Sequence, residues 1–418
     1  MTENQEPMQY NKDEVTPPSF LNHDFFVMVL SKAENDKDLT ITELEMKPGT
    51  KPGDHFASIM FKAIVSYKTR GTEVLGRSLV VKTVPIEEGL KKDFLTEMPI
   101  FTRETDMYTK VLPEMKRIME SIGDDEELAP RLIYHSSDPV VLIFEDISKF
   151  GYEMQYDFYN FENTMKIVKK LAKYHALSFF MNDNKYGNKI DFTEYKHVMK
   201  DEMIEQMKVF FDGFRYLKDD IKTWPGYEEI GEKIGALEKT FTKNLFKVYE
   251  PNPEPGFNVL CHGDFHIRNM MFIKNKDDLE KTMFLDFQIC FWGSPAVDLI
   301  YILYSIGDTD TRKRRGEMLR IYHEALTEYL NRLGCLKKPP SLLQLNIEML
   351  QRGPMEVFWS TCIFPFFCMD FSKVDMETVF TPSEDNMLEM RKAMYKNQRT
   401  VNLLKEVLPD LLYKGILD

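Results

Sequence analysis

Three polar side chains in the second half of the chain have types and spacing suited to binding a divalent metal ion. They are Asp264, Asn269 and Asp286. Two short apolar runs flank the polar residues 274–281, which predicts a β-hairpin with a long loop. In a symmetric hairpin Asn269 would lie beside Asp286, with Asp264 on the loop that enters the first strand. Because Mg²⁺ prefers hard oxygen ligands of this kind, the sequence predicts Asn269 and Asp286 as its ligands.

The order of these residues matches a pattern found in protein kinases. There the first Asp accepts the proton of the substrate hydroxyl, while the Asn and the second Asp hold Mg²⁺ beside ATP. The pattern predicts Asp264 as the catalytic base and ATP as the phosphoryl donor. The tripeptides here are His262-Gly263-Asp264 and Asp286-Phe287-Gln288, however, where a protein kinase has Arg in the middle of the first and Gly at the end of the second. His-Gly-Asp with a downstream Asn resembles instead the aminoglycoside and choline kinases, which phosphorylate small molecules. Ordinary turn capping is the alternative role for Asp264 and Asn269.

Lys82 interrupts an apolar run in a predicted strand at residues 78–84. A charged side chain that points inward there needs a partner. Glu104, in the helix expected to follow, is the predicted partner, and Asp106 is the rival if the helical phase differs. Such a pair would hold Lys82 on the α- and β-phosphates of ATP, so Lys82 and Glu104 join Asp264 as predicted catalytic residues. A solvated lysine on an edge strand is the alternative.

The turn at residues 47–58 lies between two predicted strands and is placed to fold over the ATP phosphates. Gly53, Phe56 and Ser58 belong to it, and they offer backbone N–H groups and the Ser58 hydroxyl. A plain hairpin loop explains the same residues equally well.

Polarity changes abruptly after the apolar strand predicted at residues 139–144. In a two-lobed kinase this position is the hinge between the lobes. Backbone groups of Glu145 and Ile147 are therefore expected to bond the adenine ring of ATP.

The remaining pattern predicts an α+β, two-lobed, protein-kinase-like fold. Its predicted strands occupy 40–46, 58–67, 78–84 and 139–144, and its main helices 20–32, 164–181, 203–216 and 230–249. Three parts are expected: a mobile N-terminal segment (1–18), a nucleotide-binding lobe built on an antiparallel sheet (19–146), and a larger, mainly helical lobe for catalysis and substrate binding (147–418).

Each of three further features is open to two interpretations. Asp298, in the first turn of a predicted helix, either braces the catalytic loop or interacts with the helix dipole. His175 is expected to be a buried, hydrogen-bonded residue rather than an acid or a ligand. The aromatic residues between 358 and 367 either line an apolar substrate pocket or pack in the core.

Net charge, hydropathy and cysteine spacing exclude several classes of protein. The 418 residues carry a net charge of −13, which opposes binding to nucleic acid and to anionic membranes. The basic run 312–315 is therefore expected to be a solvated helix start rather than a nucleic-acid contact. The longest apolar stretch is shorter than the roughly 20 residues of a membrane helix, and the first residues lack the features of a signal peptide. Five cysteines show no metal-ligand or disulfide spacing. We expect a cytoplasmic protein, and its protein partners stay unknown.

Several motifs in order along the chain resemble the insect ecdysteroid kinase-like family. They are Gly53-Asp-His-Phe-Ala-Ser58, Leu79-Val-Val-Lys-Thr-Val-Pro85, Phe101-x-x-Glu104-x-x-x-Tyr108-x-x-x-Leu-Pro113, Phe144-Glu-Asp-Ile147, Leu171-Ala-Lys-Tyr-His-Ala176, His262-Gly-Asp264 with Asn269, and Asp286-Phe-Gln288 followed by Ser294-Pro-Ala-x-Asp298-Leu. The resemblance implies ATP-dependent phosphorylation of a hydroxyl on an ecdysteroid, a similar steroid or a xenobiotic. One departure is Asp54-His55-Phe56, where the family pattern has Glu-Asn-Tyr. A choline or ethanolamine kinase-like activity and a non-catalytic small-ligand-binding member are the alternatives.

Overall fold

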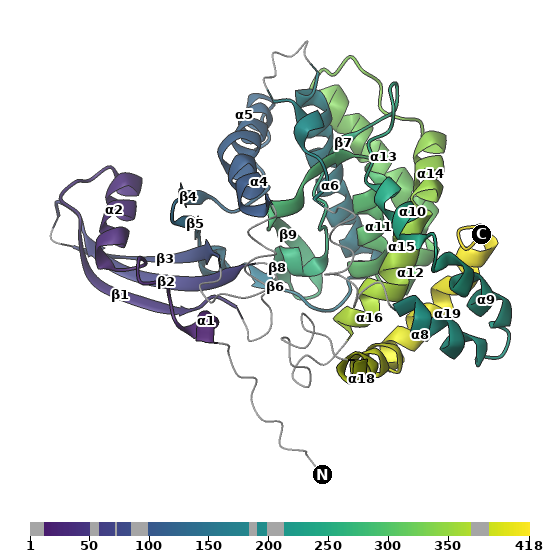
Figure 1. The fold of residues 1–418 in the computed structure, drawn as a ribbon. Helices are drawn as coiled ribbons and strands as arrows, with labels where there is room; N and C mark the ends of the chain where they lie inside the picture. Colours follow the sequence, from purple (N-terminus) through teal and green to yellow (C-terminus); the bar gives the residue numbers. More distant parts are fainter. Residues whose placement is uncertain are drawn as a thin grey trace.

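The computed structural model describes residues 12–50, 58–71, 73–84, 99–183, 190–198, 213–368 and 384–418. Its N-terminal part is an antiparallel sheet in the order β1-β2-β3-β5-β4. The strands are β1 (Thr40–Pro48), β2 (Ile59–Lys68), β3 (Val74–Thr83), β4 (Leu132–Ser137) and β5 (Val140–Glu145). Figure 1 shows this sheet on one side of the molecule and the helices of the larger part on the other.

The helix α2 (His23–Glu34) covers one face of the sheet (Figure 1). It begins where the Asn22 side chain accepts a hydrogen bond from the backbone N–H of Phe25, as the sequence predicts. Buried and partly exposed residues alternate along β2, as expected for a strand with one face on a core. The buried faces of α2 and the sheet form one hydrophobic cluster. A four-residue helix, α1 (Lys12–Val15), precedes them.

A single continuous helix follows the sheet's first three strands. It consists of α4 (Ile100–Asp106), a π-helical turn η1 (Met107–Val111) and α5 (Leu112–Ser121). Its buried residues from Met107 to Met119 belong to the hydrophobic cluster of the larger part, not to the cluster under the sheet. The helix therefore packs against the core of the larger part. It carries Glu104, whose side chain faces Lys82 on β3.

The larger part is mainly helical and is organised around α6 (Phe161–Met181), which is buried over most of its length. The helix α13 (Arg315–Arg332) packs beside it. The other elements are α8 (Gly213–Lys222), α9 (Glu228–Leu237), α10 (Phe241–Val248), α11 (Ala296–Ser305), α12 (Thr309–Lys313), α14 (Leu342–Gln351), α15 (Gly353–Phe358), the π-helical turn η8 (Trp359–Ile363), α16 (Phe364–Phe367), α18 (Glu384–Tyr395), α19 (Gln398–Tyr413) and the short 3-10 helices η2 (Ile147–Phe150) and η4 (Phe192–Glu194).

The larger part also contains two small sheets. One joins β6 (Glu153–Met154), β8 (Met270–Asn275) and β9 (Asp278–Phe284), and the other pairs β7 (Val259–Cys261) with β10 (Phe291–Gly293). The 3-10 helices η6 (Ile267–Asn269) and η7 (Phe287–Ile289) follow β7 and β9. These short elements and the loops beside them carry the motifs predicted to be catalytic.

The predicted fold class is confirmed: an antiparallel N-terminal sheet precedes a mainly helical C-terminal part. Two element predictions are wrong, because 230–249 forms two helices (α9 and α10) and because the strand β4 is absent from the prediction. The predicted helix 203–216 lies mostly outside the described residues, as does most of the segment 1–18. The division into lobes at residue 146 stays a proposal.

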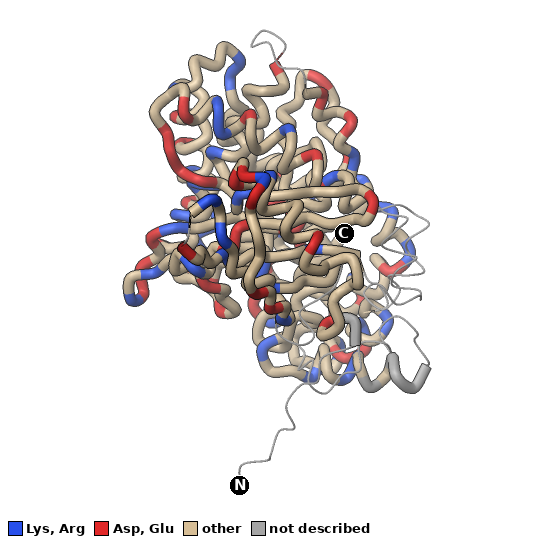
Figure 2. Tube along the Cα trace, turned by 90° about the vertical axis from the view of Figure 1, so that its left-hand side faces the viewer, with Lys and Arg blue, Asp and Glu red and all other residues tan. Residues whose placement is uncertain are grey.

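Charged residues of both signs are interspersed along the described trace (Figure 2). In the basic run, Arg312 contacts Glu406 at 2.7 Å, Arg314 contacts Glu317 at 3.0 Å and Arg315 contacts Glu356 at 2.8 Å. The run therefore forms ion pairs within the protein. None of the helices in the described part of the chain combines the length and hydropathy of a membrane span.

Candidate active site

Lys82 lies in β3 between β2 and β5, and its side chain is 5% exposed. Its Nζ is 2.6 Å from Oε2 of Glu104 and 2.5 Å from Oδ1 of Asp286. The predicted contact with Glu104 is therefore present. The rival Asp106 contacts Lys110 instead, at 2.7 Å on the same helix.

Burial and neighbouring charges together set the pKa values of Lys82 and Glu104. Burial alone lowers the pKa of Lys82, but Asp286 and Glu104 outweigh it and raise that pKa above its ordinary value. Burial raises the pKa of Glu104, and Asp286 adds to the rise against the opposing effect of Lys82. One ammonium is thus shared by two carboxylates, and burial favours the neutral form of one of them, Glu104.

Asp264 lies on the loop after β7. The preceding Gly263 has φ +84°, and a Cβ there would come within 2.5 Å of the Ile289 carbonyl oxygen, so this turn requires glycine. Oδ2 of Asp264 accepts a hydrogen bond from Nδ2 of Asn269 at 2.9 Å, and Oδ1 is 3.3 Å from Nε2 of His266. Burial raises the pKa of Asp264, yet His266, His262 and Asn269 together hold it below its ordinary value. Asp264 is therefore ionised at neutral pH.

Asp298 braces the loop that carries Asp264, as one of the two sequence readings expected. It is fully buried at the start of α11, and it accepts hydrogen bonds from the backbone N–H of His262 at 2.7 Å and of Gly263 at 3.0 Å. Nε2 of His175 lies 3.0 Å from the same carboxylate, and Nδ1 of His175 lies 2.8 Å from the hydroxyl of Tyr322. His175 is thus a buried, hydrogen-bonded residue that holds Asp298 in place.

Replacing Asp298 by alanine is expected to lower the free energy of unfolding by about 3–5 kcal/mol, because two buried backbone N–H groups lose their acceptor. Urea denaturation would measure the change. Asp410→Ala is the control, since Asp410 makes an exposed helical ion pair with Lys414 that contributes about 0.5 kcal/mol. Equal, small effects of the two substitutions would contradict the bracing role.

The hairpin β8–β9 brings Asn269 and Asp286 to one end, but not in the predicted register. Met270 pairs with Phe284, and the Leu285 N–H donates to the Asn269 carbonyl at 2.9 Å. Asn269 therefore faces Leu285, and Asp286 lies one residue further on. The predicted long loop is also wrong: two residues separate the strands, and a bulge follows Ile273.

The donor atoms at this end of the hairpin suit Mg²⁺. Asp286 adopts the left-handed conformation (φ 63°, ψ 58°) and directs its carboxylate to Lys82. Asn269 uses its amide nitrogen on Asp264, which leaves its carboxamide oxygen as the coordinating atom. Hard oxygen donors in small number, with room for phosphate oxygens, are the usual surroundings of protein-bound Mg²⁺.

The predicted nucleotide contacts are only partly within the described residues. Gly53 and Phe56 lie outside them, while Ser58 is buried directly before β2. The Glu145 N–H donates to the Arg131 carbonyl at 3.0 Å. Ile147 begins η2, two residues after the end of β5.

The sequence analysis assigned no role to two residues near this site, Asp146 and Gln288. Asp146 is 3% exposed and contacts Ser78 at 2.6 Å, the Ser148 N–H at 3.1 Å and Lys62 at 2.9 Å, so it fixes the segment between β5 and η2. Its spacing from Ser148 is an Asx-turn signal that was available in the sequence. Gln288 lies 3.5 Å from Nζ of Lys82 and donates to Asp286 at 3.2 Å.

A cavity of about 130 Å³ adjoins the catalytic loop. His266 lines it, and Trp359, Phe364 and Phe367 from the late aromatic cluster form much of its wall. A larger cavity, of about 370 Å³, lies elsewhere beside Asn252 and Arg352, away from every predicted site residue. Core packing of the aromatic cluster is confirmed for Phe358, Trp359, Phe364 and Phe366, which are buried, while its role in a substrate pocket stays a prediction.

Comparison with known proteins gives matches of three kinds. The model of the ecdysteroid kinase-like family matches residues 52–335. An N-acetylmuramate/N-acetylglucosamine kinase of Caulobacter vibrioides is 28% identical over 123 residues, which are 29% of this chain and 33% of that protein. The chain thus spans about a third of the length of this curated relative.

Similar solved structures include an ethanolamine kinase of Plasmodium vivax (TM-score 0.41, 12% identity, 93% of this chain and 89% of that one). A choline kinase of Cryptosporidium parvum has a TM-score of 0.40 at 11% identity, over 94% and 97% of the two chains. The GDP complex of an aminoglycoside 2'-phosphotransferase has a TM-score of 0.42 at 12% identity, over 92% and 100%.

Proposed function

Because the chain belongs to the ecdysteroid kinase-like family, we propose that it transfers the γ-phosphoryl group of ATP to a hydroxyl of a small molecule. The observation that carries the proposal is the position of Lys82 between Glu104, at 2.6 Å, and Asp286, at 2.5 Å. An ammonium fixed by two carboxylates from distant parts of the chain is pre-organised to receive phosphate groups.

Asp264 acts as the base in this proposal. Its carboxylate is ionised and is held by Asn269, so it can orient the substrate hydroxyl and accept its proton. Lys82 contacts the α- and β-phosphates, and Glu104 positions it. Mg²⁺, when bound by Asp286 and Asn269, supplies positive charge to the phosphate oxygens.

The nucleotide is proposed to lie against the hinge. The Glu145 carbonyl and the Ile147 N–H would bond adenine, since the Glu145 N–H already donates to Arg131. Asp146 supports both neighbours through its contacts to Ser78 and Ser148. Gly53, Phe56 and Ser58 are proposed to cover the phosphates.

The acceptor is proposed to be an ecdysteroid, a similar steroid or a xenobiotic that carries a hydroxyl, and the protein is proposed to act in the cytoplasm. A choline or ethanolamine-type activity would need aromatic faces and carboxylates to hold a cationic head group. A non-catalytic member would bind the small molecule without turnover, although Asp264, Lys82 and Asp286 are all present.

Mass spectrometry after incubation with Mg-ATP tests the proposal. The panel would contain ecdysteroids, choline, ethanolamine, plant sterols and phenols, with an Asp286 variant as the control. A phosphoryl gain on one compound in the wild type alone would support the kinase assignment and identify the acceptor class. Absence of Mg-ATP binding would overturn it in favour of the non-catalytic alternative.

A further inference from the structure

The cavity of about 370 Å³ has a lining of mixed character. Its described lining residues come from α10, from the segment that follows α10, and from the end of α14 and the start of α15. They include two cations, Lys247 and Arg352, and an apolar set made of Val248, Pro251, Pro253 and Pro354. The volume lies in the range of about 300–1,000 Å³ that is usual for small-molecule sites. A ligand that matches this lining has an anionic part and an apolar part.

Arg352 is a buried cation whose partners are all uncharged. It is 8% exposed. Its Nη2 donates to Oδ1 of Asn252 at 2.7 Å and to the Glu250 carbonyl at 3.4 Å, and its Nη1 donates to Oε1 of Gln351 at 3.3 Å. Its Nε has no hydrogen-bond partner within the described part of the chain. These contacts use three of the five N–H donors of a guanidinium, so two donors are left.

The buried carboxylate of Glu348 does not neutralise Arg352, because it binds elsewhere. Its Oε2 accepts hydrogen bonds from Nδ2 of Asn252, at 2.9 Å, and from the Ser294 hydroxyl. Asn252 therefore lies between the two charges, with its oxygen on Arg352 and its nitrogen on Glu348. Burial lowers the pKa of Arg352 below its ordinary value, against the opposing effect of nearby negative groups. A buried charge in this position is stabilised by an added anion.

Lys247 provides a second positive charge at the rim of the cavity. Its side chain is exposed, and it forms no ion pair with any residue that the structure describes. One carboxylate, that of the exposed Glu250, belongs to the described lining, so two cations face one anion. The Gln351 side chain is also exposed, and an anion that displaced it would reach Nη1 of Arg352.

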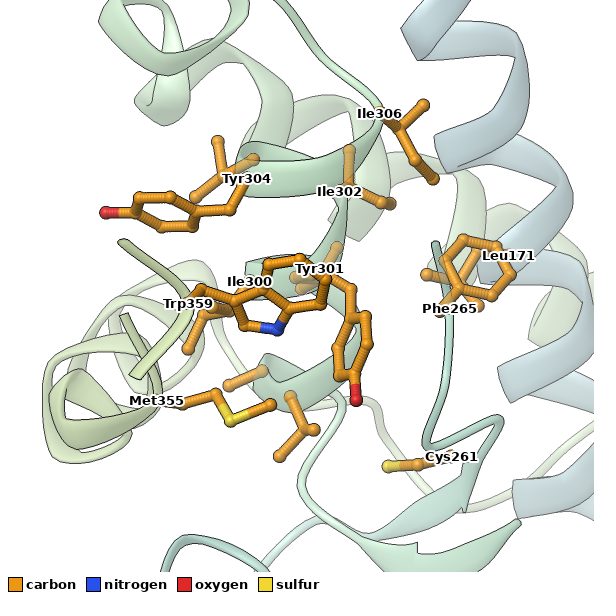
Figure 3. Packing of buried hydrophobic residues seen from close by; sticks show 14 of the residues in the cluster. Leu171, Cys261, Phe265, Ile300, Tyr301, Ile302, Tyr304, Ile306, Met355 and Trp359 are labelled. Atoms are coloured by element: carbon orange, nitrogen blue, oxygen red, sulfur yellow. The ribbon is translucent and has the colours of Figure 1, made fainter. Parts of the chain in front are cut away.

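The two helices that carry these cations are fixed to each other by the core. The hydroxyl of Tyr249 donates to Sδ of Met355 at 3.5 Å, which joins the end of α10 to α15. Met355 is fully buried, and Figure 3 shows it among the side chains of the main hydrophobic cluster. Lys247 and Arg352 are each within three residues of this contact. The cavity is therefore pre-formed, which reduces the entropic cost of binding a ligand.

We propose that this cavity is a second ligand site, which binds the phosphate monoester of a small organic molecule. Lys247 and Arg352 bind the phosphate group, and Val248 and the three prolines contact the organic group. A phosphate monoester carries a charge of about −2 at neutral pH and three acceptor oxygens. It therefore suits two cations on different helices better than a carboxylate does.

The volume of the cavity supports an organic ligand over a bare ion. An apolar protein cavity of about 150 Å³ accepts benzene. A cavity of about 370 Å³ therefore has room for one ring beside the phosphate group. Binding at this site does not depend on the proposed phosphoryl transfer.

Calorimetric titration of the full chain with phenyl phosphate tests the site. Three compounds are compared with it: inorganic phosphate lacks the ring, benzoate carries a single charge, and benzyl alcohol is neutral. Phenyl phosphate is expected to bind about tenfold or more tightly than each of them, because each loses either charged hydrogen bonds or apolar contact.

Two lysines of the same helix provide a matched pair of variants. Lys247→Glu is expected to weaken phenyl phosphate binding by about tenfold or more, since it reverses a charge beside the anion. Lys243→Glu is the control, because Lys243 is exposed one turn earlier in α10 and is not among the described lining residues. It should leave the affinity unchanged. Circular dichroism and thermal denaturation would confirm that both variants are folded.

Variants of Arg352 separate its charge from its shape. Arg352→Lys keeps the positive charge, so it should still prefer phenyl phosphate to benzyl alcohol, at a lower affinity than the wild type. Arg352→Gln removes the charge and should lose most of this preference.

Several results would overturn the inference. They are absence of phenyl phosphate binding, equal affinities for phenyl phosphate and benzyl alcohol, and equal losses in Lys247→Glu and Lys243→Glu. Inorganic phosphate bound as tightly as phenyl phosphate would show an ion site without an organic part, and tighter binding of benzoate would contradict the phosphate assignment. Binding that is lost in Lys82→Met but kept in Lys247→Glu would place the compound in the nucleotide site instead.

Discussion

Removing the Asp286 carboxylate is expected to lower kcat by about 10³-fold or more. Asp286 is the proposed Mg²⁺ ligand and contacts Lys82 at 2.5 Å. A catalytic metal contributes several kcal/mol of charge stabilisation in the transition state, and each 1.36 kcal/mol changes the rate tenfold. Asp286→Asn is the preferred variant because Asn tolerates the left-handed conformation that residue 286 adopts (φ 63°), whereas Ala does so poorly.

The fold should survive this substitution. Lys82 would keep Glu104 as its partner at 2.6 Å, so one buried ammonium would face one carboxylate rather than two. Thermal denaturation is expected to show an unchanged or slightly higher midpoint. Asp278→Asn, in the same hairpin but paired with Lys166 near the surface, is the matched control and should keep full turnover. Normal turnover by Asp286→Asn would refute its role as metal ligand.

Asp264→Ala is expected to lower kcat by about 10²–10⁴-fold, the range typical of a positioned general base. Affinity for Mg-ATP should stay the same, because Asp264 contacts Asn269 and His266 and is proposed to face the acceptor. Steady-state kinetics and calorimetry with a non-hydrolysable ATP analogue would measure the two quantities. A parallel loss of nucleotide affinity would show that Asp264 serves mainly to hold the loop.

The pH profile gives this second prediction an independent readout. The pKa of Asp264 lies below its ordinary value, so the carboxylate is charged at neutral pH and loses its charge only as the pH falls through that lowered pKa. The wild type should therefore show no acidic loss of kcat/KM from this group down to about pH 4. A wild-type transition near pH 6 that is absent from the residual activity of Asp264→Ala would contradict the assignment.

Much of this arrangement follows from local chemistry that the sequence displays. Lys82 breaks an apolar strand, and a buried lysine needs a carboxylate, which made Glu104 predictable. The glycine before Asp264 and the helix start at Asp298 also indicate a turn and its support. What the sequence did not reveal is the convergence on Lys82 of Asp286 and Gln288, because contacts between residues so far apart depend on how whole elements pack.

The errors have equally specific causes. The register of the hairpin depends on its turn, where Lys276 adopts a left-handed conformation (φ 57°) that allows a two-residue connection. Lysine is not a typical residue for this conformation, so the sequence did not indicate the short turn. The strand β4 begins with three apolar residues and ends with His135 and two serines, and none of its residues is fully buried, so it has no clear alternation of buried and exposed positions. Its pairing with β5 stabilises it. The break between α9 and α10, at residues 238–240, contains no glycine or proline, and Gly235 in the last turn of α9 is the signal that the prediction overlooked.

The two π-helical turns in the described part of the chain are the places where these helices tolerate the loss of one residue. The turn at Met107–Val111 follows Glu104 in one continuous helix, and the turn at Trp359–Ile363 begins with the cavity residue Trp359. A π-helical turn accommodates one residue more than an α-helical turn. Deleting one residue from either segment would therefore leave a regular α-helical turn with the two halves of the helix still in phase, whereas the same deletion elsewhere in the helix would rotate one half against the other by about 100°. Relatives that lack the extra residue at either turn would still place Glu104 beside Lys82 and Trp359 at the cavity.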